Sequence, residues 1–493
     1  MSPTVALYDC NALRVLEKRA AATCAGGAFE LMQRAGQAAW QYLLEHWPQA
    51  QRIVVACGPG NNGGDGYVLA TLAHRSGRDV RVVRLDAPRG ELAQRACEDY
   101  LAAGGHAEPF DGALPAADLV VDAVFGIGLA RAIDGIALVM IDAINLQPAP
   151  VFALDVPSGV DAERGCVAGA AVVAARTLQF VAPHRGLATG RALDHVGTLG
   201  IAPLDIDASV FAGVPVAATL LRADALADWL RPRPRDNHKG KHGHVLCVGG
   251  EAGSGGAVML CAQAALRCGA GLVSVATRIE HVSPLLAHCP EAMVHAVETA
   301  DALGPLLARA TLVAIGPGLG QSPWGRMLLD LALASQKSLL LDADALNLLA
   351  ATPRALSPGA ILTPHPGEAA RLLAMTAAQV QADRFDAARR LVDIFQCVVV
   401  LKGAGTIVAA PGEIPRVIAA GNPGMAVGGM GDVLTGVIAA LRAQGLRAFD
   451  AASCGALLHA VAGDAAAGEG ERGLLPSDLF APLRRLANPP VRQ

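Results

Sequence analysis

The sequence predicts an α/β protein with two parallel-sheet domains. In both halves of the chain, short apolar runs rich in β-branched residues alternate with longer stretches whose apolar residues recur at helical spacing. Most of these runs end in loops of glycine and polar residues, as strands do in a parallel sheet that is covered by helices. A Pro- and Arg-rich stretch at 231–236 resembles a linker, and the residues before it read as a helix. We therefore expect domains at 1–215 and 216–493.

The composition indicates a folded protein with large cores. The 493 residues are 53% hydrophobic and 17% charged. The net charge is −4 and there is no long basic run, so we expect neither nucleic acid nor a membrane surface as a partner. No uncharged apolar run reaches the ~18 residues of a membrane span. The eleven cysteines are scattered without a CxxC pair, which favours reduced thiols and a cytoplasmic location.

The first half begins with helices and continues as a strand–loop–helix repeat. Residues 11–47 carry apolar residues at i, i+3 and i+4 spacing and predict helices. Buried strands are expected at 52–58, 79–85, 118–126 and 151–159. Because ligands bind at the carboxyl ends of strands in such sheets, the loops that follow the strands form the candidate site.

Three of these loops carry polar side chains suited to binding. They are Gly58–Gly66, Asp122–Arg131 and Asp155–Gly159. Their amide, carboxylate and hydroxyl oxygens suit an alkali or alkaline-earth ion, or ribose and phosphate. One such loop alone is more often an ordinary turn, but three at successive strand ends favour a site. The first loop is not the GxGxxG dinucleotide fingerprint, so ordinary dehydrogenase chemistry is not implied.

The motifs GPGNNGGDG, DAVFGIG and LDVPSG, in this order, resemble the YjeF N-terminal domain family, the NAD(P)H-hydrate epimerases, over about residues 10–205. The resemblance implies a Rossmann-like fold and a potassium ion, K+, held by Asn62, Asp122 and Ser158. Asp155 is the candidate acid–base catalyst. The turn APHRGL at 182–187 departs from the family, which more often has a lysine before the glycine. The residues implied to contact the hydrated nicotinamide nucleotide are Asn61, Asn62, Gly63, Gly64, Asp65, Gly126, Ile127, Gly128, Leu129, Ala130, Arg131, Ala132 and Asp155.

A second strand–loop pattern follows the Pro-rich stretch. Strands are expected at 244–250, 272–277 and 311–320, with a helix at 256–271. Three further apolar runs, which begin at 338, 360 and 398, repeat the change from strand to polar loop. These strands should also bring their loops together at one edge of a sheet.

The stretch GNPGMAVGGMGDVLTG, Gly421–Gly436, is the most informative loop of the second half. Its glycines let backbone N–H groups approach an anion, and the helix expected after them adds the positive end of its dipole. Asp432 would lie on that rim, where a carboxylate can act as a base beside a bound phosphate; the alternative is a helix N-cap. Lys402 and Gly403–Thr406 supply a cation, backbone donors and a hydroxyl. His365 lies between two prolines, although a lone histidine is more often a packing residue.

The strand–loop pattern and GGMGD resemble ribokinase-like phosphotransferases. More closely, HKGKHGHV, GPGLG, TPHPGE, LKGAGT and the Gly421–Gly436 stretch resemble the YjeF C-terminal domain family, the ADP/ATP-dependent NAD(P)H-hydrate dehydratases, over about residues 220–485. The resemblance implies that the hydrate pocket is lined by Ala257, Gly318, His365 and Asp432. The residues implied to bind the adenine nucleotide are Lys402, Gly403, Ala404, Gly405, Thr406 and Gly431.

Together the two resemblances imply repair of hydrated nicotinamide cofactors. R- and S-NAD(P)HX would be interconverted, and S-NAD(P)HX dehydrated to NAD(P)H with ADP or ATP, and Mg2+, giving AMP or ADP and phosphate. Phosphorylation turns the C6 hydroxyl into a good leaving group, with Asp432 as the base and the glycine loop stabilising charge. The expected partners are the small molecules NADHX, NADPHX and ADP or ATP, and further copies of the chain in a homo-oligomer, with a tetramer as the first expectation.

Two other functions fit parts of the pattern. A ribokinase-like small-molecule kinase with an N-terminal nucleotide-binding module would leave the phosphate on its product. A nucleotide-binding regulatory protein, in which one half has lost its chemistry, is disfavoured by the intact Asp155, Lys402 and Asp432.

Overall fold

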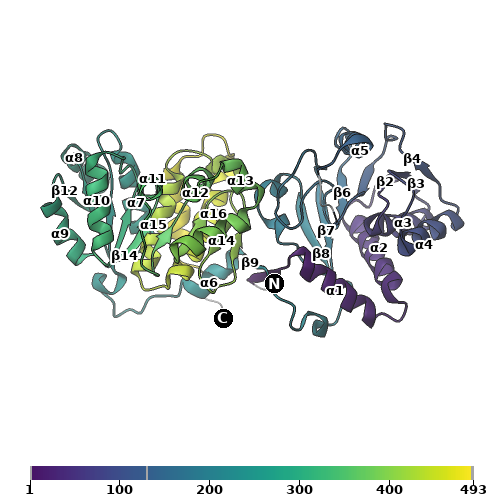
Figure 1. Cartoon of the computed structure of the whole chain (residues 1–493), viewed down its shortest axis with the longest axis horizontal. Coiled ribbons are helices and arrows are strands. Elements are labelled where there is room, and N and C mark those ends of the chain that lie inside the picture. Colours follow the sequence, from purple (N-terminus) through teal and green to yellow (C-terminus); the bar gives the residue numbers. More distant parts are fainter. Residues whose placement is uncertain (1–2, 129–131, 490–493) are drawn as a thin grey trace. The chain divides into compact units, whose positions relative to one another are not determined.

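The computed structural model describes residues 3–128 and 132–489, which form two compact units (Figure 1). Residues Ala6–Ala218 make up the N-terminal unit, and Thr219 onward, together with residues 3–5, make up the C-terminal unit. Within the described ranges, no helix is long and apolar enough to cross a membrane.

The N-terminal unit contains a seven-stranded sheet in the order β4-β3-β2-β5-β6-β7-β8, in which every pairing is parallel. The four strands expected from the sequence are present as β2, β3, β5 and β6, each shorter than its apolar run because the run continues into the loop. The strands are β2 (Arg52–Cys57), β3 (Asp79–Arg84), β4 (Ala107–Pro109), β5 (Leu119–Ala123), β6 (Val151–Leu154), β7 (Arg176–Phe180) and β8 (Thr198–Ala202).

Helices cover both faces of this sheet, as a parallel sheet requires. Alternate residues of β2 show the two faces: Val55 packs in one core with α1 to α4, and Val54 packs in a second core with Met140 and Ile144 of α5. The two faces explain why β2 reads as a continuous apolar run. The helices are α1 (Cys10–Thr23), α2 (Gly27–His46), α3 (Asn61–Arg75), α4 (Glu91–Ala102) and α5 (Gly135–Asn145).

The C-terminal unit contains an eleven-stranded sheet in the order β1-β9-β18-β17-β16-β15-β14-β13-β10-β11-β12. The strands from β10 to β16 pair in parallel, and β17 pairs antiparallel with both of its neighbours. The strands are β1 (Thr4–Leu7), β9 (Ala218–Leu221), β10 (His244–Val248), β11 (Leu272–Thr277), β12 (Met293–Ala296), β13 (Leu312–Ile315), β14 (Ser338–Leu341), β15 (Ile361–Leu362), β16 (Val398–Leu401), β17 (Thr406–Ala409) and β18 (Arg416–Ile418).

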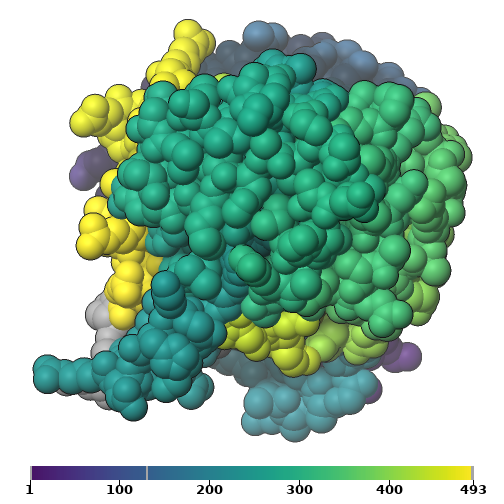
Figure 2. Space-filling view, turned by 90° about the vertical axis from the view of Figure 1, so that its left-hand side faces the viewer, coloured from purple at the N-terminus to yellow at the C-terminus, as the bar shows by residue number. Residues whose placement is uncertain are grey.

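One large core joins this sheet to the central helices α7, α15 and α16. In space-filling form the segments after β10 pack into a continuous surface, coloured teal to green (Figure 2). The helices of the unit are α6 (Leu226–Trp229), α7 (Gly255–Arg267), α8 (Ile279–His288), α9 (Ala300–Arg309), α10 (Pro323–Ala334), α11 (Ala343–Ala351), α12 (Pro366–Leu373), α13 (Ala377–Ala382), α14 (Arg384–Phe395), α15 (Met430–Ala443), α16 (Ala448–Ala466) and α17 (Phe480–Leu486).

The division between the units differs in two ways from the expected domains 1–215 and 216–493. It falls after Ala218, and the Pro- and Arg-rich stretch 231–236 is an exposed segment inside the C-terminal unit rather than a linker. The start of the chain also belongs to the C-terminal sheet, where β1 neighbours β9 and the Arg222 N–H donates to the Pro3 carbonyl at 3.0 Å. A strand that pairs with a partner some 200 residues away leaves no local signal in the sequence.

We expect fragments 6–218 and 219–493 to fold separately, because each contains a complete helix-covered sheet. The 219–493 fragment should melt at a lower temperature than the same fragment with residues 1–8 fused to its N-terminus, since β1 protects the edge of the sheet. Thermal unfolding followed by circular dichroism measures both. If neither fragment unfolds cooperatively, the two units are not independent.

Candidate active sites

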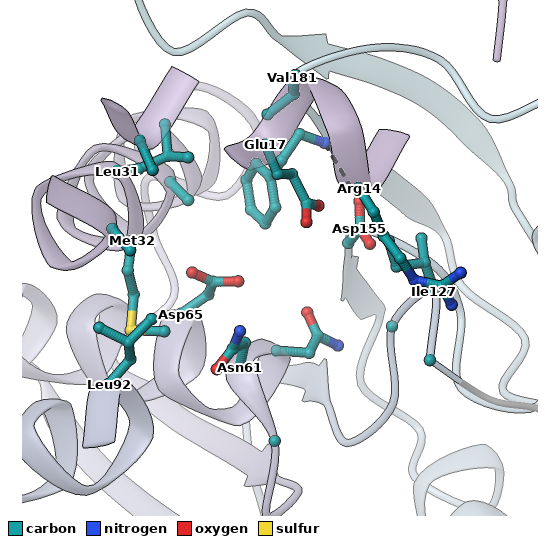
Figure 3. Close-up of a pocket in the computed structure, with 18 of the residues that line it drawn as sticks. Arg14, Glu17, Leu31, Met32, Asn61, Asp65, Leu92, Ile127, Asp155 and Val181 are labelled. Carbon is teal, nitrogen blue, oxygen red and sulfur yellow. Dashed lines mark hydrogen bonds between the residues drawn. The ribbon is translucent and has the colours of Figure 1, made fainter. Parts of the chain in front are cut away.

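A pocket of about 850 Å³ opens in the N-terminal unit (Figure 3). Its polar wall comes from the segments that follow β2, β5 and β6, as the strand–loop pattern predicts, and α1 and α2 supply the opposite wall. Of the residues implied to contact substrate, those that line the pocket are Asn61, Asn62, Asp65, Gly126, Ile127, Gly128 and Asp155.

The other described residues implied to contact substrate are not among those that line the pocket. Gly63 and Gly64 are buried in the first turn of α3 and do not line the pocket. They are needed for close packing: a Cβ at Gly63 would lie 2.0 Å from the Gly58 carbonyl oxygen, and one at Gly64 would lie 2.6 Å from the Met32 side chain. Ala132 is exposed and is not part of the lining. Leu129, Ala130 and Arg131 lie outside the described residues.

Asp122 and Ser158 form a buried polar pair at the ends of β5 and β6. The Ser158 hydroxyl donates to Asp122 Oδ1 at 2.6 Å, and the Ser158 N–H donates to Asp122 Oδ2 at 2.8 Å. Burial raises the pKa of Asp122 to about 6, although these hydrogen bonds oppose the shift. The Phe125 N–H donates to the Ser158 hydroxyl at 2.8 Å, which ties the second and third loops together.

Asn62 lies beside these loops with its amide unsatisfied. Its Oδ1 and Nδ2 are both buried, and neither has a hydrogen-bond partner in the described structure. A Cβ at Gly126 would be 3.5 Å from the Asn62 Cβ and 3.2 Å from Asp155 Oδ2, so the three loops meet around Gly126. An unpaired buried amide is costly in a native fold and indicates a missing partner.

Asp155 adopts a left-handed backbone conformation, with φ of 64°. Such strain is uncommon for a residue other than glycine and occurs preferentially at functional sites. Its carboxylate Oδ1 lies 2.8 Å from Nε2 of His184, a residue that is only 2% exposed, and also accepts from the Phe180 N–H at 3.4 Å. His184 is the histidine of the APHRGL turn, to which the sequence pattern assigned no role.

Three charged residues of α1, namely Arg14, Glu17 and Lys18, also line the pocket, and the sequence did not point to them. They lie on a helix that precedes the strand–loop repeat, so the rule that places sites at strand ends could not find them. A helix with charged residues on one side otherwise looks like a solvated surface helix.

The C-terminal unit holds a second polar cluster beneath the Gly421–Gly436 loop. Lys402 Nζ lies 2.7 Å from Asp342 Oδ1 and 3.7 Å from Glu368 Oε2. Burial alone would lower the pKa of Lys402, but Asp342 and Glu368 outweigh it and raise the pKa, so the ammonium stays charged. Asp342 is 1% exposed, and its Oδ2 accepts from the Thr435 hydroxyl at 2.7 Å. A Cβ at Gly431 would lie 3.3 Å from Lys402 Nζ.

Asp432 lies in the first turn of α15, where the sequence places it at the rim of the glycine loop. No side-chain cap closes this helix, and Gly429, in the left-handed region with φ of 96°, occupies the cap position. Burial, together with the negative charge of Asp342, raises the pKa of Asp432 to about 7. A carboxyl group with that pKa can exchange a proton near neutral pH, which a simple structural cap does not need.

The expected nucleotide segment 402–406 is braced by an arginine that the sequence did not reveal. Arg384 is fully buried, and its Nη2 donates to the carbonyls of Leu401 and Lys402 at 3.2 Å and of Gly405 at 3.4 Å. The Thr406 hydroxyl donates to the Gly403 carbonyl at 3.1 Å. These contacts fix the backbone of the loop.

The three other residues implied for the hydrate pocket fall into two places. Ala257 and Gly318 are neighbours, since a Cβ at Gly318 would lie 3.2 Å from the Ala257 Cβ. His365 caps α12: its Nδ1 accepts from the Gly367 N–H at 2.9 Å, and its Nε2 lies 3.4 Å from Glu368 Oε1. Burial lowers the pKa of His365. Through Glu368, His365 belongs to the same polar cluster as Lys402.

Comparison with known proteins assigns a family to each half. Residues 28–186 match the family model for the YjeF-related protein N-terminus, and residues 245–485 match the model for NAD(P)H-hydrate dehydratase. The bifunctional NAD(P)H-hydrate repair enzyme Nnr of Coxiella burnetii is 47% identical over 98% of this chain and 99% of its own length. The enzyme of that name from Escherichia coli is 46% identical over 98% of this chain and 94% of its own length.

A solved structure resembles the C-terminal part of the fold. A ribokinase-like superfamily protein from Enterococcus faecalis is 32% identical, with a TM-score of 0.51, over 55% of this chain and 96% of its own. The likeness confirms the ribokinase-like fold expected for the second half.

Proposed function

Because this chain belongs to the family of bifunctional NAD(P)H-hydrate repair enzymes, we propose that its two units catalyse two steps of one repair. The N-terminal unit epimerises R- and S-NAD(P)HX. The C-terminal unit dehydrates S-NAD(P)HX to NAD(P)H and consumes ADP or ATP, giving AMP or ADP and phosphate. The observation that carries the proposal is that each matched half holds its own polar site built from loops at strand ends or helix starts.

In the dehydratase unit, Asp432 is the general base. It takes the proton of the C6 hydroxyl as that oxygen attacks the terminal phosphoryl group of the nucleotide. The free N–H groups at the start of α15 and the glycine backbone stabilise the charge on the transferred group. The ring nitrogen then expels phosphate from C6, and loss of a C5 proton restores the reduced nicotinamide.

The nucleotide and the hydrate occupy neighbouring places around Asp432. Lys402, Gly403, Ala404, Gly405, Thr406 and Gly431 bind the adenine nucleotide, with Mg2+ on its phosphates. Ala257, Gly318 and His365 line the hydrate side. The ion pair of Lys402 with Asp342 supports this assignment indirectly, because it holds the ammonium beneath Gly431 rather than free in solvent.

In the epimerase unit, Asp155 is the acid–base residue, and the hydrated nucleotide is bound by the pocket residues Asn61, Asn62, Asp65, Gly126, Ile127 and Gly128. The support for Asp155 is its strained backbone, its place in the pocket wall and its contact with the buried His184. Strain that is retained in a pocket wall, with a side chain held by a buried partner, is typical of a positioned catalytic group.

The residues Asn62, Asp122 and Ser158 fit a potassium ion. They offer only oxygen ligands, which suits a hard cation and not zinc. The buried Oδ1 of Asn62 lacks a partner in the described structure, and burial raises the pKa of Asp122. A cation at this place would give the amide oxygen a partner and would stabilise the buried carboxylate. When bound, K+ would position the phosphate and ribose of the substrate.

We expect Asp122→Asn to raise the K+ concentration that half-saturates epimerisation by at least about tenfold, equivalent to ~1.4 kcal/mol of ion binding. Half-saturation in the wild type should also need more K+ below pH 6, because the proton on Asp122, whose pKa is about 6 without the ion, then competes with K+. A K+ titration with Na+ held constant measures both. Asp111→Ala, at an exposed aspartate of the same unit, is the control. An Asp122→Asn enzyme with an unchanged K+ response would remove Asp122 from the site.

A ribokinase-like kinase remains the alternative, and the product distinguishes the two. Purified protein with S-hydrated NADH and either ADP or ATP should release inorganic phosphate in step with the recovery of reduced-nicotinamide absorbance. A phosphorylated product that accumulates instead would favour the kinase. We further propose that the protein acts in the cytoplasm as a homo-oligomer, with a tetramer as the first state to test by sedimentation.

A further inference from the structure

Three carboxylates from three different elements face the pocket of the N-terminal unit. Glu17 comes from α1, Asp65 from α3 and Asp155 from the end of β6. Figure 3 shows the Glu17 and Asp155 side chains near one another on one side of the pocket and Asp65 across from them. Asp65 and Asp155 belong to the loop motifs and have roles in the proposed function, whereas Glu17 belongs to no motif and has no assigned role.

Glu17 is held in an unusual electrostatic setting for a residue of a surface helix. Glu17 is exposed and lines the pocket, yet partial desolvation by the surrounding protein and the negative charge of Asp155 raise its pKa to about 7. Arg14 and His184 oppose this shift without cancelling it. Lys18 of α1 is a further cation that lines the pocket.

The two other carboxylates are in different settings. Asp155 Oδ1 is fixed by the His184 ring at 2.8 Å and the Phe180 N–H at 3.4 Å. Asp65 has its pKa raised well above the usual value by burial and by the charges of Asp155 and Glu17. Neighbouring carboxyl groups in unlike environments can divide acid and base roles.

We propose that Glu17 is a second acid–base residue of the epimerase and works as a pair with Asp155. This inference rests on the proposed function of the N-terminal unit. Its basis is geometric: Glu17 and Asp155 reach the same part of one pocket from α1 and β6, and one is fixed by His184 while the other is not.

The pair can open and close the hydrated ring without any other reagent. C6 of the hydrate carries a hydroxyl and is bonded to ring N1. Asp155 accepts the hydroxyl proton, the O–H electron pair becomes the second bond of a C6 aldehyde, and the C6–N1 pair passes to N1. Protonated Glu17 gives N1 its proton. Closure of N1 onto the other face of the aldehyde reverses both transfers and returns the pair to its starting state.

The active form of the pair therefore holds one proton, in both directions of the reaction. Epimerisation should fall as the pH rises above about 7, because Glu17 then loses that proton. We expect Glu17→Gln in the full chain to slow conversion of the R to the S hydrate by about 10²–10⁴-fold, the usual effect of losing a positioned acid or base. It should also remove the alkaline limb of the pH profile. Glu17→Asp should keep the limb and part of the rate.

The Glu17→Gln experiment needs three controls: a test of folding, an exposed glutamate variant and Asp155→Asn. Thermal unfolding of full-length Glu17→Gln, compared with the wild-type chain by circular dichroism, reports whether the N-terminal unit is folded, and Glu45→Gln, at an exposed glutamate of α2, should epimerise normally. If Glu17→Gln keeps the wild-type rate while Asp155→Asn is slow, the role of Glu17 is refuted and the proposed function stands. If Asp155→Asn keeps the wild-type rate, the assignment of Asp155 is wrong, whatever Glu17 does.

Isotope labelling tests the route itself. Ring opening keeps the C6 oxygen, so epimerisation in H₂¹⁸O should yield an S product without ¹⁸O after one turnover. Full incorporation of ¹⁸O would mean that water leaves and returns, which contradicts the proposed exchange of protons with N1.

Discussion

Asp432→Asn should reduce dehydration of the S hydrate by about 10²–10⁴-fold and leave epimerisation unchanged. Asparagine keeps the size of the side chain but cannot accept the hydroxyl proton. The glycine backbone and Lys402 are untouched, so the nucleotide should bind as before. The wild-type rate should rise with pH through about 7, as Asp432 loses its proton, and the variant should lack this dependence.

The measurements are recovery of reduced-nicotinamide absorbance from the pure S hydrate across a pH series, and nucleotide affinity by calorimetry. Asp464→Asn is a matched control, because Asp464 accepts from the Gly421 N–H at 3.0 Å and so touches the same loop away from Asp432. Retention by Asp432→Asn of more than about a tenth of the wild-type rate would exclude the base role. A loss of epimerisation would show that the two sites are not separate.

Lys402→Ala should destabilise the C-terminal unit by about 3–5 kcal/mol, as well as weaken nucleotide binding. The reason is that the side chains of Lys402 and Asp342 are only 16% and 2% exposed, so the change leaves a carboxylate buried without its cation. Glu368, at 3.7 Å, loses the same partner. Urea unfolding measures the free energy of unfolding, and a cycle with Asp342→Ala isolates the coupling between the two side chains.

Lys337→Ala provides the comparison for Lys402→Ala. In the part of the chain that the structure describes, Lys337 Nζ donates only to the Ala308 carbonyl, at 3.0 Å and in an exposed position, so its loss should change stability by less than about 0.5 kcal/mol. If Lys402→Ala is as stable as Lys337→Ala, Lys402 is not part of a buried network. Any loss of activity in Lys402→Ala would then come only from a lost contact between Lys402 and the phosphate of the nucleotide.

The sequence predicted the sheets and the loops of the sites because their signals are local. β2, β5 and β6 are continuous apolar runs, and each is followed by the glycines and carboxylates that a strand end requires. Asp122 and Asp155 could therefore be assigned to one edge of the N-terminal sheet, and Asp432 to the glycine-rich start of a helix in the second half. From the residue types alone, these loops could bind either a cation or a phosphate. The family resemblance then assigned a role to each residue.

Features that depend on distant partners were not predictable. Glu17 is brought to the pocket by the packing of α1, and Arg384 braces the 402–406 loop from α14. The pairing of β1 with the C-terminal sheet joins residues that are far apart in the chain. In each case the sequence near the residue is that of an ordinary helix or a short strand, and only the tertiary fold shows the contact.

The central claim is that two separate sites act in sequence, and mixing two single-site variants tests it most directly. Asp155→Asn and Asp432→Asn proteins are each given the pure R hydrate with ADP or ATP, alone and then together. Neither alone should restore NADH above the spontaneous rate, but the mixture should, because the S hydrate made by one variant is dehydrated by the other. A mixture no faster than either variant alone, with both variants folded, would contradict the claim.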